Sequence, residues 1–170
     1  MDKTTLDALN EQMREEINSA YLYLAMSSDM KFKNLNGAAS WFEIQAQEEI
    51  AHATKFYNFM HDRGGQPELP AIDKPQVSWA SPVEAFEATL THEKHISGCI
   101  DKLVDMARAN NDHPTEIFLQ WFVTEQVEEE ATADEILQRY KFVGDNPNGI
   151  LMLDRELGSR QTGADNAAAE

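Results

Sequence analysis

The chain has 170 residues, and its 30 Asp and Glu against 14 Lys and Arg give a formal net charge of −16 with histidine neutral. This length suits one domain with a sizeable core, and so acidic a surface repels nucleic acid and anionic membranes while it attracts cations. The single cysteine, Cys99, excludes a disulfide framework or a thiolate cluster within one chain and fits a reducing cytosol, where we interpret it as a small buried hydrophobe. Since no apolar run approaches the roughly 20 residues of a membrane span, we expect a cytoplasmic protein with no nucleic-acid or membrane partner. The acidity is explained equally well by a need for solubility alone and by a role in handling cations.

Glycine and proline divide the chain into long stretches that predict helices. Four stretches contain no proline and at most one glycine, and each predicts a helix of roughly 40 Å at about 1.5 Å per residue. They are residues 5–34, 38–63, 83–113 and 115–143. Ser81, Pro82 and Glu84 predict the start of the third helix, because proline is favoured at the first helical position.

The segments between these helices predict how they are connected. The first and second helices, and likewise the third and fourth, are joined by short links and should form antiparallel hairpins. Residues 64–81 are far too long for a hairpin turn, so they predict a crossover that lets the second and third helices run parallel. Residues 150–157 predict a short fifth helix, and residues 159–170 a disordered polar tail. The predicted fold is all-α, a four-helix bundle with a long crossover and a short fifth helix, in one domain over residues 1–158.

Each long helix carries an apolar stripe in alternating steps of three and four residues, and every stripe turns polar near its middle. The polar positions are Glu16 on the first helix, Gln45, Glu49 and His52 on the second, Glu93 on the third, and Gln126 and Glu129 on the fourth. On any single helix, a misread register explains such a residue equally well. Because all four helices place carboxylates at matching depth, the pattern predicts one polar layer across the bundle.

Buried carboxylates without partners cost several kcal/mol each, and no Lys or Arg lies on these stripes. Either the carboxyls share protons with raised pKa values, or they bind cations. The spacing of Glu49 and His52 favours cations, since side chains three residues apart share a helix face and can reach one ion. A Glu-x-x-His on one helix with single Glu residues on others is typical of di-iron sites in bundles. Oxygen ligands with one imidazole suit iron or manganese.

This pattern predicts two unequal metal positions. The first would use Glu16, Glu49 and His52, and the second would use Glu49 and Glu93 with Gln126 nearby. The fourth helix lacks the second Glu-x-x-His of the symmetric arrangement. The second ion would therefore be under-coordinated, more easily exchanged and open to dioxygen.

Four motifs resemble the haem-free bacterial ferritins in order and spacing over residues 5–158. They are LNEQMREEINSAYLYLAM, AQEEIAHA, HEKHI and FLQWFVTEQVEEE. The resemblance implies the same two iron positions, with Tyr23 as a tyrosine that hydrogen-bonds a ligand and supplies an electron. It also implies a third, outer iron site, for which a solvated acidic face is the alternative; its residues would be Glu48, Glu125, Glu128 and Glu129. Gln45 would support the ligands, and Trp121 would lie beside the site unless it only packs.

The family resemblance further implies an iron-storage function. Fe(II) would be oxidised by O2, with H2O2 as the other possible oxidant, and stored as a ferric oxide mineral inside a shell of 24 subunits. The fifth helix would line a symmetry axis. Glu116 is a candidate for a channel through which iron enters, with a solvated helix start as the alternative. We expect no haem, because Ile50 stands where related bacterioferritins carry the haem-ligating Met.

Two other functions remain open on this pattern. One is a discrete di-iron oxidase or peroxidase that stores no iron. The other is a non-catalytic bundle whose acidic layer only binds metal. Iron loading and the oxidation rate of site variants distinguish the three.

Overall fold

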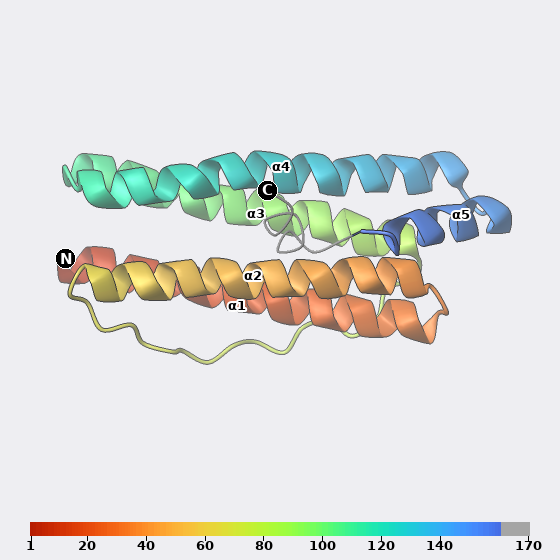
Figure 1. The fold of residues 1–170 in the computed structure, drawn as a ribbon, viewed down its shortest axis with the longest axis horizontal. Helices are drawn as coiled ribbons and strands as arrows, with labels where there is room; N and C mark the ends of the chain where they lie inside the picture. The colour runs from red at the N-terminus through yellow and green to blue at the C-terminus, as the bar shows by residue number, and fades with distance from the viewer. Residues whose placement is uncertain (161–170) are drawn as a thin grey trace, which may run out of the picture.

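Over residues 1–160, the part of the chain that the computed structural model describes, the backbone forms five helices. They are α1 (Lys3–Phe32), α2 (Asn36–Asp62), α3 (Pro82–Ala109), α4 (His113–Val143) and α5 (Pro147–Leu157). The hairpins α1–α2 and α3–α4 lie side by side, and α2 and α3 run parallel (Figure 1). The predicted all-α fold with its long crossover and short fifth helix is confirmed. Of the tail predicted over residues 159–170, residues 161–170 lie outside the described part of the chain, whereas Ser159 and Arg160 are described and form hydrogen bonds.

Side-chain caps set several helix starts. The carboxylate of Asp2 accepts a hydrogen bond from the Thr5 amide at 3.0 Å, and Ser81 caps α3 through the Glu84 amide at 3.2 Å, as the sequence predicts. The short helix α5 begins at Pro147, three residues earlier than predicted, because the Asn146 side chain accepts from the first-turn amides. The helix α3 ends four residues earlier than predicted, at Ala109, since Asn111 takes a φ of 53° and turns the chain.

The crossover between α2 and α3 runs along the length of the first hairpin (Figure 1). Polar side chains of α1 hold its backbone at intervals. Asn10 accepts from the Glu68 amide at 2.9 Å, and Asn18 accepts from the Asp73 amide at 3.2 Å. These bonds explain how a segment without secondary structure keeps a fixed course.

The core consists of two apolar clusters with a polar layer between them. One cluster includes Met30, Phe42 and Phe86, and the other includes Leu9 and Phe56. The seven polar residues that the stripes predicted are all buried, with at most 8% of any of them exposed. The predicted polar layer is therefore present.

Close backbone contact holds α5 against the start of α2. A Cβ atom added to Gly37 would lie 1.6 Å from the carbonyl oxygen of Asp154, so only glycine permits this approach. The Asp154 carboxylate accepts a hydrogen bond from the Ala38 amide at 2.8 Å. Within residues 1–160, none of the helices combines the length and apolar character that crossing a membrane requires.

Candidate metal centre

The first predicted metal position is assembled by α1 and α2. One ligand atom from each of Glu16, Glu49 and His52 lies within 4.8 Å of the other two, and all three residues are buried. The Nδ1 atom of His52 lies 3.3 Å from Oε2 of Glu49, one helical turn away. The amide of Gln12 donates to Oε1 of Glu16 at 2.8 Å. Gln12 was not predicted, although its position four residues before Glu16 places both on one face of α1.

The surroundings of the second carboxylate oxygen of Glu16 indicate whether this position fits a cation. Within residues 1–160, Oε2 of Glu16 is buried and accepts no hydrogen bond. A buried carboxylate oxygen without a partner is costly, and a metal ion shared with Glu49 and His52 would satisfy it. Carboxylate oxygens with one imidazole are suitable donors for Fe²⁺.

Burial of the layer makes its carboxyls weak acids in the metal-free protein. Desolvation, followed by the charge of Glu49, raises the pKa of Glu16 well above its usual range. Desolvation, followed by the charges of Glu93 and Glu129, does the same to the pKa of Glu49. The pKa of Glu129 rises to about 8, chiefly through burial and then through Glu93. A bound cation would supply the missing countercharge and release these protons.

The second predicted position centres on Glu93 of α3. The Tyr23 hydroxyl donates to Oε1 of Glu93, and the Gln126 amide donates to Oε2 at 3.1 Å. Burial, followed by the charges of Glu93 and Glu49, raises the pKa of Tyr23 well above its usual range, so the phenol remains a donor. The structure thus places Tyr23, Gln126 and Glu93 together, with Glu93 held by two donors.

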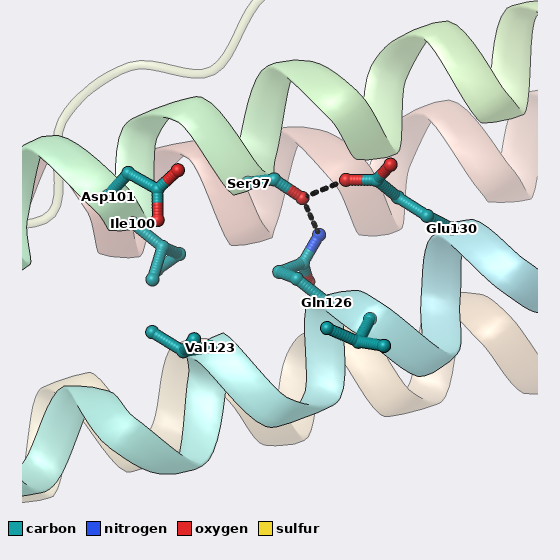
Figure 2. A pocket seen from close by; sticks show the side chains of 7 residues that line it. Ser97, Ile100, Asp101, Val123, Gln126 and Glu130 are labelled. Atoms are coloured by element: carbon teal, nitrogen blue, oxygen red, sulfur yellow. Dashed lines mark hydrogen bonds between the residues drawn. The ribbon is translucent and has the colours of Figure 1, made fainter.

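Beyond Gln126, a pocket opens between α3 and α4 with a volume of about 320 Å³. Figure 2 shows Ser97 between Gln126 and Glu130. The Ser97 hydroxyl donates to Glu130 and accepts from the Gln126 amide at 3.5 Å. Ser97 and Glu130 were not predicted, although Ser97 follows Glu93 by one helical turn.

The outer acidic residues divide into two sets. Glu125 and Glu129 form a second group with His52, with one ligand atom from each within 4.8 Å of the other two. The Gln45 amide donates to Glu129. Among the described residues, the structure does not bring Glu48 and Glu128 into this group. Glu48 instead forms an ion pair with Arg160 at 2.6 Å, and Glu128 lies on the exposed face of α4.

The remaining candidates lie around the centre. The Trp121 ring packs edge-on against the His52 ring at a centroid distance of 5.3 Å. Glu116 accepts a hydrogen bond from Arg108 at 2.7 Å near the start of α4. Cys99 is partly exposed, not fully buried as expected, because it faces a surface pocket that Glu15 and His95 also line.

Comparison with known proteins agrees with this architecture. Residues 6–143 match the family model of the ferritin-like domain. The bacterial non-heme ferritin of Bacteroides fragilis (strain 638R) is 42% identical over 154 residues, which cover 91% of this chain and 96% of the relative. The bacterial non-heme ferritin of Staphylococcus aureus (strain MRSA252) is 36% identical over 160 residues, which cover 94% and 96%.

A solved structure of an open pore ferritin from the hyperthermophilic archaeon Archaeoglobus fulgidus superposes with a TM-score of 0.94. It is 42% identical, and the match covers 95% of this chain and 99% of that chain. The family model, the two relatives and the superposition all support the family resemblance of the four sequence motifs. The chain therefore belongs to the ferritin family.

Proposed function

We propose that this protein stores iron, and that it oxidises Fe(II) at the buried centre before storage. The observation that carries the proposal is Oε2 of Glu16, which is buried beside Glu49 and His52 and has no hydrogen-bond partner among residues 1–160. The names of the relatives, bacterial non-heme ferritins, and the acidity of the chain support it. In this proposal Fe(II) is the substrate and stored ferric iron is the product.

The first Fe(II) binds where α1 and α2 meet. Gln12 holds one oxygen of Glu16 and leaves the other free for the ion. Since the pKa values of Glu16 and Glu49 are raised, binding is accompanied by proton release, and it weakens as the pH falls.

The second Fe(II) binds between Glu49 and Glu93. Tyr23 and Gln126 hold Glu93 from opposite helices, so this carboxylate is oriented before the ion arrives. Two Fe(II) ions then each lose one electron, and these two electrons with two protons reduce O2 to H2O2. Tyr23, as a buried phenol next to Glu93, is positioned to donate a hydrogen bond throughout.

Ferric product leaves through the second group, formed by His52, Glu125 and Glu129. His52 belongs to both groups, so it lies at the boundary between the oxidation centre and the outer face of α2 and α4. The outer iron site of the resemblance would lie here. Two of its three donors, Glu125 and Glu129, are carboxylates, which suit hard Fe³⁺.

Storage requires a closed assembly, and we propose a homo-oligomeric cage, of 24 subunits by family analogy. The α1–α2 face exposes large apolar side chains that another subunit would cover. They are Tyr21, Leu24, Ile50 and Tyr57. We further propose a cytoplasmic protein that binds no haem.

The experiment that tests this proposal measures aerobic Fe(II) oxidation by the metal-free protein and two variants. Glu49→Gln removes a carboxylate shared by both metal positions, and Glu128→Gln makes the same chemical change on the exposed face of α4. We expect oxidation to slow by about 100-fold in the first variant and to stay at the wild-type rate in the second. Equal rates in all three proteins would overturn the proposed centre.

Iron loading separates storage from its alternatives. A discrete di-iron oxidase would retain about two iron atoms per chain, whereas a storage protein retains many more after repeated additions of Fe(II). A non-catalytic bundle would bind iron without accelerating its oxidation.

A further inference from the structure

Arg160 lies three residues after the end of α5 and folds back onto the middle of α2. Its Nη1 atom donates to Oε1 of Gln45 at 2.8 Å, and its Nη2 atom donates to Oε2 of Glu48 at 2.6 Å. The guanidinium also lies over the Trp41 ring, 5.0 Å from its centroid. Three contacts from one side chain fix the position of the cation.

The fold positions this arginine through α5. The Gly37–Asp154 contact sets the approach of α5 to α2, and the chain then turns with the Arg160 amide bonded to the Leu157 carbonyl at 3.2 Å. Arg155, in the last turn of α5, is exposed to solvent instead. The contact of Arg160 with Glu48 therefore depends on the docking of α5.

Both partners of Arg160 belong to the outer side of the metal centre. Gln45 accepts from Arg160 through its oxygen and donates to Glu129 through its nitrogen, so Arg160 fixes which way the Gln45 amide faces. Glu48 is one residue from Glu49 and is one of the two members of the predicted outer iron site that lie outside the group of His52, Glu125 and Glu129. The carboxylate that an outer cation would need is occupied by a guanidinium.

We propose that Arg160 is a tethered cation that competes with a multivalent metal ion for Glu48. While Arg160 is in place, the donors that the described residues give the outer site are His52, Glu125 and Glu129. When the Arg160 side chain moves away from Glu48, Glu48 turns toward them and the site gains a fourth donor. Arg160 is thus a positioning residue that controls how tightly the outgoing ion is held. This inference rests on the outer site of the proposed function.

The test is a titration of metal-free protein with Tb³⁺, which is trivalent, prefers carboxylate oxygens and undergoes no redox reaction under these conditions. Tryptophan-sensitised luminescence reports binding, and Trp41 and Trp121 lie close to the site. The titration resolves Tb³⁺ ions of different affinity, and the outer site is expected to bind the weakest of them. We expect Arg160→Ala to bind this ion about ten-fold more tightly than the wild type does, because a competing charge is removed. Arg155→Ala makes the same charge change on α5 and should bind as the wild type does.

A double variant shows whether Glu48 is the contested group. In Glu48→Gln protein, adding Arg160→Ala should produce no further gain in Tb³⁺ affinity. Equal Tb³⁺ binding by Arg160→Ala and Arg155→Ala overturns the inference, and so does a gain that persists without Glu48. Light scattering and circular dichroism confirm that each variant is assembled and helical. If Arg160→Ala fails to assemble, Arg160→Lys replaces it, because the single ammonium of lysine cannot contact Gln45 and Glu48 at once. Arg160→Lys should then show a smaller gain in Tb³⁺ affinity. No gain in affinity overturns the inference.

The inference and the proposed function fail in different experiments. If the wild type does not accelerate Fe(II) oxidation, the proposed function is wrong whatever Tb³⁺ shows. If iron oxidation and storage proceed but the Arg160 variants bind Tb³⁺ as the wild type does, only the role of Arg160 is wrong.

Discussion

The metal-free protein should lose stability as the pH rises through neutrality, and Glu129→Gln should remove part of that loss. Glu129 is 8% exposed, and burial with the charge of Glu93 raises its pKa to about 8 from an ordinary 4.5. A carboxyl whose pKa is raised by folding contributes stability that is fully present below the unfolded pKa. That contribution is lost as the pH rises through the folded value.

The size of the effect follows from the two pKa values. Between pH 5 and pH 8, the native Glu129 keeps a proton that the unfolded chain has already released, and the free energy of unfolding falls by roughly 3.5 kcal/mol per subunit. Glu16, Glu49 and Glu93 have raised pKa values and act in the same direction. His92 acts in the opposite direction, since burial lowers its pKa to about 4; its contribution over this range is roughly 2 kcal/mol.

The assay compares urea unfolding of metal-free wild type and Glu129→Gln at several pH values between 5 and 8, followed by circular dichroism. Glutamine keeps the shape and can still accept from Gln45, so the difference between the two proteins isolates the ionisation of Glu129. Wild type should lose more stability than the variant toward pH 8, and a divalent cation should reverse the loss. Identical pH dependence in the two proteins would show that Glu129 does not hold its proton near neutrality and that its raised pKa is wrong.

Three further predictions test other parts of the structure. His52→Ala removes a side chain shared by both ligand groups, so Fe(II) oxidation should slow about 100-fold while light scattering shows an unchanged assembly; an unchanged rate would contradict the assignment. Tyr23→Phe removes the donor to Glu93. It should lower the free energy of unfolding by about 1–3 kcal/mol, measured by denaturation, and slow Fe(II) oxidation, measured by stopped-flow absorbance. A variant with wild-type stability and wild-type oxidation rate would contradict the contact. Gly37→Ala should displace α5, because the added Cβ would lie 1.6 Å from Asp154. Its Tb³⁺ affinity should then rise as in Arg160→Ala, and wild-type affinity would show that α5 does not position Arg160.

The sequence was sufficient to predict the bundle, because its features are local or periodic. Glycine and proline mark the links, and the seven polar positions appear as interruptions of apolar stripes that helix geometry places at one depth. The predicted ends of some helices differ from the observed ends by three or four residues. The end of α3 depends on the φ of Asn111, and the start of α5 depends on a side-chain cap by Asn146, neither of which alters the periodicity.

The candidate centre was predicted less completely where contacts are distant in sequence. Gln12 could have been found from its spacing to Glu16. Arg160 could not, because it is 112 residues from Glu48 and reaches it only through the docking of α5 on Gly37. For the same reason, the family resemblance places Glu48 with the outer acidic residues and does not reveal its contact with Arg160. The choice between a buried polar layer and a solvated face depends on burial, which only the packed structure shows.

The most direct test of the central claim is the amount of iron that stays with the protein after aerobic addition of Fe(II) in large excess over the chains. Size-exclusion chromatography with iron analysis would be applied to the wild type and to Glu49→Gln. We expect the wild type to carry far more than about two iron atoms per chain in the assembled fraction, and Glu49→Gln to acquire them much more slowly. If the wild type retains two or fewer iron atoms per chain, or if Glu49→Gln loads iron as fast as the wild type, the proposed storage through the buried centre is wrong.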